Sequence, residues 1–116
     1  MPDAKMMIVA ICSDGKWPSC NVHPNFGRCA IFHFVKLEGE SATLLKSVPN
    51  AFLDSNGAGV AAAGLVAENK AIAAVAGQFG PKASAALSKW GIRMVQSSGS
   101  ASEALARLAT ESTTRA

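Results

Sequence analysis

Cysteine and histidine side chains are the groups in this chain that could act as nucleophiles or ligate a metal. The three cysteines are Cys12, Cys20 and Cys29, and the histidines are His23 and His33. A cysteine nucleophile needs a base close in space, and the sequence alone reveals no catalytic triad. The cysteines are odd in number and form no CxxC pair, so we expect no disulfide framework and a reducing compartment. Structural cysteines are therefore favoured over a cysteine enzyme.

The surroundings of each cysteine suggest different environments. Cys12 ends an apolar run, which is typical of a small core residue. Cys20 lies in a polar segment, and we expect it to be the most exposed thiol. Cys29 follows Arg28, a cation that favours the thiolate form. Cys20 and Cys29 are therefore the candidate metal-ligating thiols.

The two histidines also differ in their surroundings. His33 lies within AIFHFVKL, whose alternating faces are both largely apolar, so we expect a hydrogen-bonded core histidine. His23 lies in the polar stretch Ser13–Arg28, which we interpret as a long loop of the kind that often carries function. His23 is therefore a candidate ligand. Trp17 and Phe26 of the same loop could cover a pocket or anchor the loop to the core.

Three turns of small residues could bind an anion. VAGQFGPK, from Val75 to Lys82, predicts a strand, a tight turn at Gly77 and a helix that begins near Pro81. The segments Asn56–Gly59 and Ser97–Gly99 repeat this pattern. Free N–H groups at helix starts attract anions, so we expect a pocket where the three turns meet. GQFGPK matches neither nucleotide-binding glycine motif, which weakens a nucleotide assignment.

The elements that position these residues form an α/β pattern. The apolar run Met6–Cys12 predicts a central strand, and a hairpin through Gly39 predicts an antiparallel neighbour. Right-handed βαβ units should follow, giving a mixed five-stranded sheet flanked by helices in one domain, residues 1–109, with a frayed tail over 110–116. The further predicted strands are Ala30–Leu37, Ser41–Val48, Ala71–Ala76 and Ile92–Gln96, and the predicted helices are Gly57–Glu68, Pro81–Trp90 and one that begins with a capping box at Ser100–Glu103.

This order of elements resembles the ribonuclease-H-like fold, whose nucleases hold two metal ions with several carboxylates. Only Asp14 follows a predicted central strand here, so nuclease chemistry is set aside. The net charge of +3 favours anions, but no basic run is typical of nucleic-acid binding. No signal peptide or membrane-length apolar run is present, and we expect a cytoplasmic protein.

Several stretches together resemble one known family. They are VHPNFGRCAIFHF, then NGAGVAAAGLVAENKAIAAVAGQFGPKASAALSKWGIRMV, then a glycine turn and a final helix. In this order they resemble the dinitrogenase iron–molybdenum cofactor biosynthesis family, from Met7 to about Leu108. The resemblance implies a ribonuclease-H-like fold without nuclease acids. It also implies a role in binding or carrying metal–sulfur clusters during nitrogenase cofactor assembly.

The resemblance also bears on the cargo. Small single-domain members of the family hold a molybdenum–copper sulfide cluster without covalent attachment. Cofactor-binding relatives carry a histidine directly before the Phe-Gly of the loop, whereas this chain has Asn25 there and His23 two residues earlier. Cys29 matches a cysteine that follows this motif in the cofactor carriers. The resemblance therefore favours a molybdenum–copper cluster over the iron–molybdenum cofactor.

From these observations we expect a non-enzymatic carrier of an anionic, molybdenum-containing metal–sulfide cluster. The alternative is a regulatory or interaction module that binds a phosphate-bearing small molecule or a protein partner. Other proteins of a cofactor-delivery complex are expected partners, and nucleic acid and membrane are not. Direct metal ligands would come from His23, Cys20 or Cys29. The expected cofactor-binding residues are Lys16, His23, Asn25, Phe26, Gly27, Arg28, Asn56, Gly57, Gly59, Gly77, Gln78, Gly80, Pro81, Lys82 and Gly99.

Overall fold

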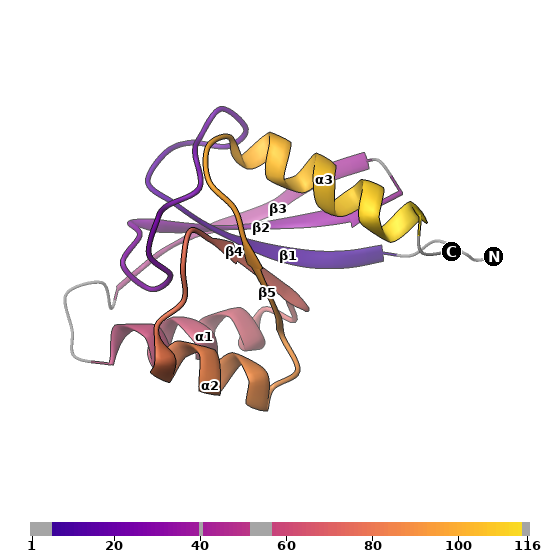
Figure 1. Cartoon of the computed structure of the whole chain (residues 1–116). Coiled ribbons are helices and arrows are strands. Elements are labelled where there is room, and N and C mark those ends of the chain that lie inside the picture. The colour runs from indigo at the N-terminus through magenta and orange to yellow at the C-terminus, as the bar shows by residue number, and fades with distance from the viewer. Residues whose placement is uncertain (1–5, 40, 52–56, 115–116) are drawn as a thin grey trace.

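A computed structural model describes residues 6–39, 41–51 and 57–114 of the chain. Five strands and three helices occur in these ranges in the order that the sequence predicts (Figure 1). The strands are β1 (Met6–Ser13), β2 (Ile31–Glu38), β3 (Ser41–Pro49), β4 (Ala73–Ala76) and β5 (Arg93–Gln96), and the helices are α1 (Ala58–Glu68), α2 (Pro81–Lys89) and α3 (Ala101–Thr114).

The strands form one mixed sheet in the order β3-β2-β1-β4-β5. β1 is central, as its uninterrupted apolar sequence predicts, and it pairs antiparallel with β2 and parallel with β4. β2 and β3 form the predicted hairpin, and β5 continues the parallel half beside β4. This topology confirms the predicted mixed α/β fold and places the ends of β1, β4 and β5 at the same edge of the sheet.

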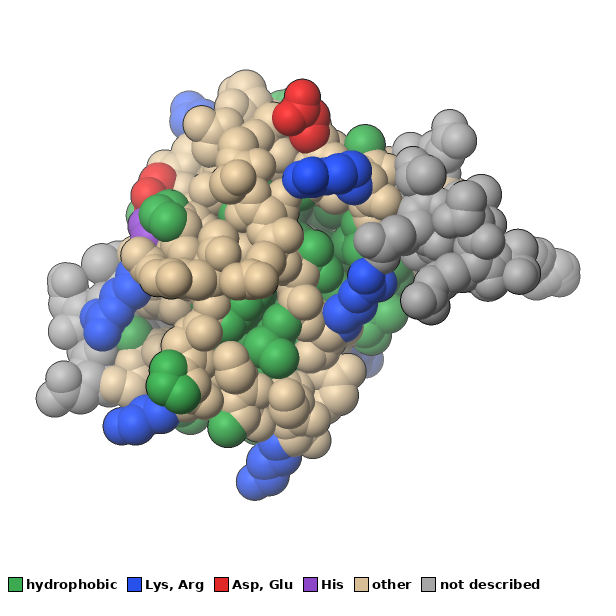
Figure 2. Space-filling view, viewed as in Figure 1, with side chains coloured by type: hydrophobic (Ala, Val, Ile, Leu, Met, Phe, Trp, Pro, Cys, Tyr) green, Lys and Arg blue, Asp and Glu red, His purple; other side chains and the backbone are tan. Residues whose placement is uncertain are grey.

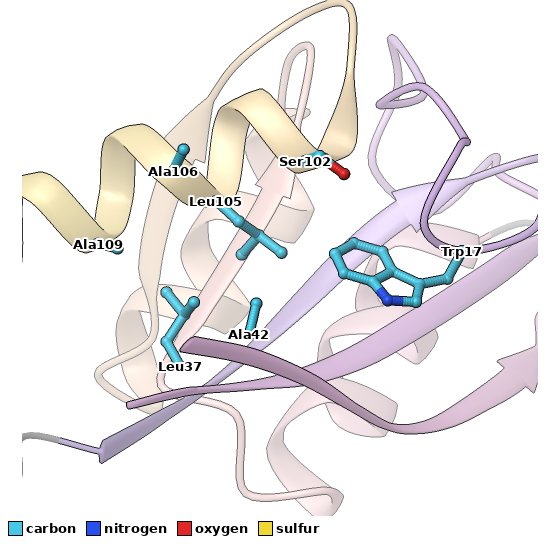
Figure 3. A pocket seen from close by; sticks show the side chains of 7 residues that line it. All are labelled: Trp17, Leu37, Ala42, Ser102, Leu105, Ala106 and Ala109. Carbon is cyan, nitrogen blue, oxygen red and sulfur yellow. The ribbon is translucent and has the colours of Figure 1, made fainter. Parts of the chain in front are cut away.

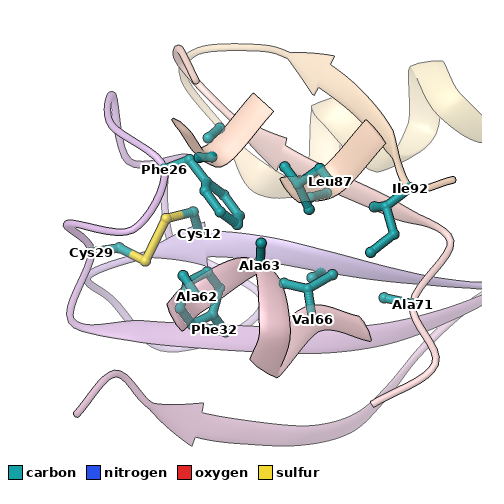
Figure 4. Close-up of a cluster of buried hydrophobic side chains, with 14 of the residues drawn as sticks. Cys12, Phe26, Cys29, Phe32, Ala62, Ala63, Val66, Ala71, Leu87 and Ile92 are labelled. Carbon is teal, nitrogen blue, oxygen red and sulfur yellow. A yellow bond between two sulfur atoms is a disulfide. The ribbon is translucent and has the colours of Figure 1, made fainter. Parts of the chain in front are cut away.

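Helices cover both faces of the sheet (Figure 1), with α1 and α2 on one face and α3 on the other. The alternation of β1 supplies both cores. Ala10 and Cys12 point toward α1 and α2, while Val9 and Ile11 point toward α3. Figure 4 shows the first core, in which Phe26 and Phe32 pack near Ala62, Val66 and Leu87.

Helix α3 begins as the capping box predicts, because the Glu103 N–H donates to Ser100 Oγ at 3.3 Å. Leu105 and Leu108 are buried beneath it and form its inner face. The helix extends to Thr114, into the segment 110–116 that the sequence predicts as a frayed tail. The polar C-terminal sequence does not indicate that the helix continues this far.

Two other predicted boundaries are also corrected. β4 begins at Ala73, two residues after the predicted start, since Ala71 and Ile72 form the approach to the strand. Helix α2 ends at Lys89, one residue before its predicted end, and Trp90 is 48% exposed as the C-cap.

The segment between β1 and β2 is more firmly attached than a loop assignment suggests. Cys12 and Cys29 form a disulfide that joins the end of β1 to the end of this segment (Figure 4), which corrects the prediction of unpaired cysteines. Isolated bridges also join Val22 to Ser13, Asn21 to Ser100 and Asn25 to Gln78. The peptide bond before Pro18 is cis. The disulfide and the bridges join residues that are not neighbours in the sequence, so the local sequence could not reveal them.

Candidate functional site at the carboxyl edge of the sheet

Three segments meet where β1, β4 and β5 end, and two of them contain glycine turns that the sequence predicts, at Gly77 and at Ser97–Gly99. They are residues 14–30, 77–80 and 97–100. The N–H of Gly77 donates to the His23 carbonyl at 2.9 Å, and the N–H of Phe26 donates to the Gln78 carbonyl at 3.0 Å. The N–H of Val22 donates to the Gly99 carbonyl at 2.8 Å. Backbone hydrogen bonds thus hold the long segment against both turns.

Gly77 allows the closest of these approaches. A Cβ at this position would lie 2.6 Å from Pro24 Cα and 2.7 Å from Pro24 O, so a side chain does not fit. The Gln78 side chain donates to Asn25 Oδ1, which fastens the same contact from the outside. The requirement for glycine here comes from backbone packing as well as from the turn.

Phe26 and Gly27 anchor the long segment between β1 and β2 to the face of the sheet that α1 and α2 cover. Phe26 is buried and stacks on Phe79 with ring centroids 5.2 Å apart. Gly27 has a φ of 92°, and a Cβ there would lie 2.9 Å from Gly59 Cα at the start of α1. The buried Asn50 amide donates to the carbonyls of Gly27 and Cys29, each at 2.9 Å. Of the two roles considered for Phe26, the structure shows the anchor.

Trp17 lies away from this edge, on the α3 face (Figure 3). Its half-buried ring lines an apolar hollow of about 120 Å³ between α3 and the β2–β3 hairpin. Leu37 and Leu105 line the same hollow. Trp17 therefore packs the segment against α3.

Both ring nitrogens of His23 are occupied by groups of the protein. The Asn25 N–H donates to Nδ1 at 3.0 Å, and Nδ1 also lies 3.1 Å from the Asn25 carbonyl oxygen. Nε2 lies 3.3 Å from Asp14 Oδ2, and Asp14 Oδ1 accepts the Ala30 N–H at 2.7 Å. A metal could reach Nε2 only after Asp14 moves.

The candidate thiol ligands are less accessible than predicted. Cys29 is fully buried and joined to Cys12, so it carries no free thiol in this state. Cys20, predicted to be the most exposed thiol, is only 5% exposed because it packs among the residues under α3. The described residues contain no cluster of three or more His, Cys, Asp or Glu side chains suited to a metal ion.

The predicted cations lie on two segments and are all exposed. Lys16 and Arg28 belong to the long segment between β1 and β2, and Lys82 lies in the first turn of α2. Figure 2 shows Lys and Arg side chains dispersed over one face and its rim, with few acidic side chains between them. The charge is therefore a diffuse positive field, not a single basic patch.

The two predicted helix starts lie beside the anchor made by Phe26 and Gly27. Gly57 is the N-cap of α1 with a φ of 78°, and Gly80 is the N-cap of α2 directly before Pro81. Neither helix start has a side-chain cap. A Cβ on Gly59 would lie 3.0 Å from Ala83 Cβ, so the helices pack closely. Asn56, also a predicted site residue, lies outside the described residues.

An open hollow of about 390 Å³ lies between the ends of β4 and β5 and the middle of α3. Its lining residues are Gly77, Gln96, Ser97, Ser98 and Arg107. Arg107 donates to Ser97 Oγ and so holds its guanidinium over the end of β5. Figure 2 shows this face hollowed beneath α3.

Of the residues that line this hollow, Gly77 was predicted from the sequence as a site residue, and Ser97 and Ser98 as part of a turn beside a pocket, but Gln96 and Arg107 were not predicted. Ser97 and Ser98 directly follow a parallel strand, which is a usable signal for a ligand site. Arg107 offered no such signal, because it lies among the alternating polar and apolar residues of an amphipathic helix. Only the fold brings Arg107 over the end of β5.

No helix in the part of the chain that the structure describes is long and apolar enough to cross a membrane. Comparison with curated proteins gives no match. Among solved structures, the apo form of the orange protein from Desulfovibrio gigas is 30% identical, with a TM-score of 0.79 over 94% of this chain and 92% of that one.

Two more distant structures show the same fold. A protein titled a putative NifB protein from Thermotoga is 23% identical, with a TM-score of 0.64 over 94% of this chain and 88% of that one. A protein titled a putative dinitrogenase from Methanocaldococcus jannaschii is 14% identical, with a TM-score of 0.65 over 90% and 89%.

The family model described as dinitrogenase iron-molybdenum cofactor matches residues 6–111, which is nearly the whole chain. The match spans every strand and all but the end of α3. It agrees with the likeness to the orange protein in sequence and in fold. The chain therefore belongs to the dinitrogenase iron–molybdenum cofactor family.

Proposed function

We propose that this protein is a non-enzymatic carrier of an anionic metal–sulfide cluster that contains molybdenum. Membership of the cofactor family gives the general role of binding or carrying a cofactor. The likeness to the orange protein supports a small single-domain carrier, for which a molybdenum–copper sulfide is the favoured cargo. Delivery partners would be other proteins of the same assembly process.

The proposal rests on the thiols, which are paired or buried at an edge of the sheet that is rich in backbone N–H donors. Cys12 and Cys29 are paired, and Cys20 is buried, so thiolates are poorly placed to enclose a cluster. A preassembled thiometalate already contains its sulfur and needs a shaped, positive surface. The uncapped starts of α1 and α2 and the diffuse positive field supply this.

Reconstitution with a synthetic thiomolybdate, with and without Cu(I), tests this proposal. We expect a coloured complex that survives gel filtration and weakens as salt rises, since exposed charges are screened within about 8 Å at physiological ionic strength. Arg28→Ala and Lys82→Ala should weaken binding more than Cys20→Ser. Lys89→Ala, which removes an exposed charge at the far end of α2, is the matched control.

The opposite ranking would overturn the mode of binding. If one cysteine substitution abolishes the colour while the charge substitutions have little effect, the cluster is ligated by thiolate. If no thiometalate binds at any salt concentration, the carrier function itself is wrong.

The alternative function, a regulatory module for a phosphate-bearing small molecule, has one observation in its favour. The hollow over the end of β5 is lined by hydroxyl groups and a guanidinium, which are suited to phosphate oxygens.

A further inference from the structure

We propose that the hollow lined by Gly77, Gln96, Ser97, Ser98 and Arg107 is a binding site for a tetrahedral oxyanion. The ligand is either a free dianion or the phosphate group of a small molecule. This site is separate from the helix starts and cations proposed to hold the cluster, and it does not depend on that cargo.

Arg107 supplies the charge and is already oriented. One N–H of its guanidinium donates to Ser97 Oγ, and a guanidinium has five donors in a planar fork. Among the side chains that the structure describes, no carboxylate forms an ion pair with Arg107. Bidentate pairing with an oxyanion is the interaction for which such a fork is best suited.

The backbone of β5 adds a donor on the same side. The N–H groups of Arg93 and Ser97 point to β4, where they donate to the carbonyls of Ile72 and Ala76 at 2.9 and 3.0 Å. Alternation along the strand turns the Gln96 N–H the other way, toward the open edge. Because β5 is the edge strand, this N–H is directed out of the sheet beside the hollow.

The chemistry of these donors favours oxygen over sulfur. Hydroxyl, amide and guanidinium N–H groups form strong hydrogen bonds with anionic oxygen, and the planar guanidinium fork matches the geometry of phosphate oxygens. Gly77 contributes backbone without a side chain, which leaves the hollow open between the strand ends. A phosphate, sulfate or oxometalate matches this donor set better than a sulfide cluster does.

A second hollow of about 150 Å³ adjoins the first and distinguishes the two sources of the oxyanion. Gln96, Ser97 and Arg107 line both, and Val95, Ala104 and Leu108 add an apolar wall to the second. A free dianion has no apolar part, so it would leave the apolar wall of the second hollow uncovered. The organic part of a phosphomonoester could lie against it.

Titration of the isotopically labelled protein with inorganic phosphate, molybdate and a phenyl phosphomonoester, followed by amide NMR, tests the site. We expect saturable shifts at Gly77 and at Gln96–Ser98. Arg107→Gln should weaken binding about tenfold or more, because it removes a charge-assisted bidentate contact. Arg107→Lys keeps the charge but not the fork and should lie between. Lys89→Gln, a matched loss of charge at the end of α2, should bind as the parent does.

Tighter binding of the phosphomonoester than of the free anions would assign the site to a phosphate-bearing molecule, and the reverse order to a free oxyanion. The proposal is overturned if the shifts do not saturate at tens of millimolar anion. It is also overturned if Arg107→Gln binds as tightly as the parent. Thiometalate binding that persists in Arg107→Gln would leave the carrier function intact, so the two proposals fail separately.

Discussion

At the scale of single residues, the site depends on a backbone contact that allows no side chain at Gly77. A Cβ there would lie 2.6 Å from Pro24 Cα, so Gly77→Ala must push the segment that carries His23 and Asn25 away from the strand ends. We expect a loss of about 1–3 kcal/mol in the free energy of unfolding, as for other overpacked positions. Chemical denaturation measures it.

Gly80→Ala is the comparison for that change. Gly80 has a φ of −70°, and a Cβ added there would meet nothing within 4 Å. The substitution should therefore cost under about 1 kcal/mol, mainly through its N-cap position. If both variants lose the same small amount of unfolding free energy, the segment that carries Pro24 moves to accommodate the side chain at position 77 without an energetic cost.

Residue environments were predictable where the local pattern decides them. His33 was predicted as a hydrogen-bonded core histidine, and it is 2% exposed with Ser47 Oγ and Gly15 O each 2.7 Å from a ring nitrogen. Cys20 was predicted as exposed and is buried. A Cβ on Gly15 would lie 3.1 Å from Cys20 Cβ, and the Cys20 carbonyl accepts the Ala101 N–H from the start of α3. No sequence pattern encodes those contacts.

At the scale of elements, α1 contains a glycine with no steric need for it. Gly64 lies in the middle of α1, and a Cβ there would meet only Trp90 Cη2, at an ordinary 3.9 Å. Gly64→Ala should therefore raise the free energy of unfolding by about 0.5–1 kcal/mol through helix propensity. A thermal or denaturant melt checks this, and a destabilised variant would show that the helix is packed too tightly for a methyl group.

Helix α3 is held to the sheet by its buried leucines. Leu105 is 2% exposed, so Leu105→Ala should lower the free energy of unfolding by about 2–5 kcal/mol through lost contacts and a cavity. The control is Ala106→Ser at the next residue, which is exposed. It should change the free energy of unfolding by less than about 0.5 kcal/mol. A loss below about 1 kcal/mol for Leu105→Ala would mean that α3 packs only peripherally.

The elements were largely predictable because their signals are local. The apolar run of β1, the short hairpin turn and the Ser100–Glu103 cap each mark an element without help from the rest of the chain. The site was less predictable, because Arg107 and the Ser97 hydroxyl meet only through the docking of α3 on the sheet.

At the scale of the whole molecule, the Cys12–Cys29 disulfide links β1 to the site segment. Its reduction should lower the free energy of unfolding by about 2–4 kcal/mol, as expected when a loop of this length is released in the unfolded chain. Denaturant melts with and without a dithiol reductant measure this. A Cys12→Ala/Cys29→Ala double variant should be insensitive to the reductant, and a parent protein equally insensitive would show that the two thiols are not joined.

The same bond makes residues 12–29 a covalent ring that contains His23, Asn25 and Arg28. A protease that cuts the backbone once inside this ring cannot separate the pieces, because β1 and the remainder of the chain stay joined through sulfur. On a denaturing gel, the nicked protein should therefore migrate as the full-length chain without reductant. It should release an N-terminal peptide only after reduction. The residues around the carboxyl edge would then stay attached to the sheet even after their backbone has been broken.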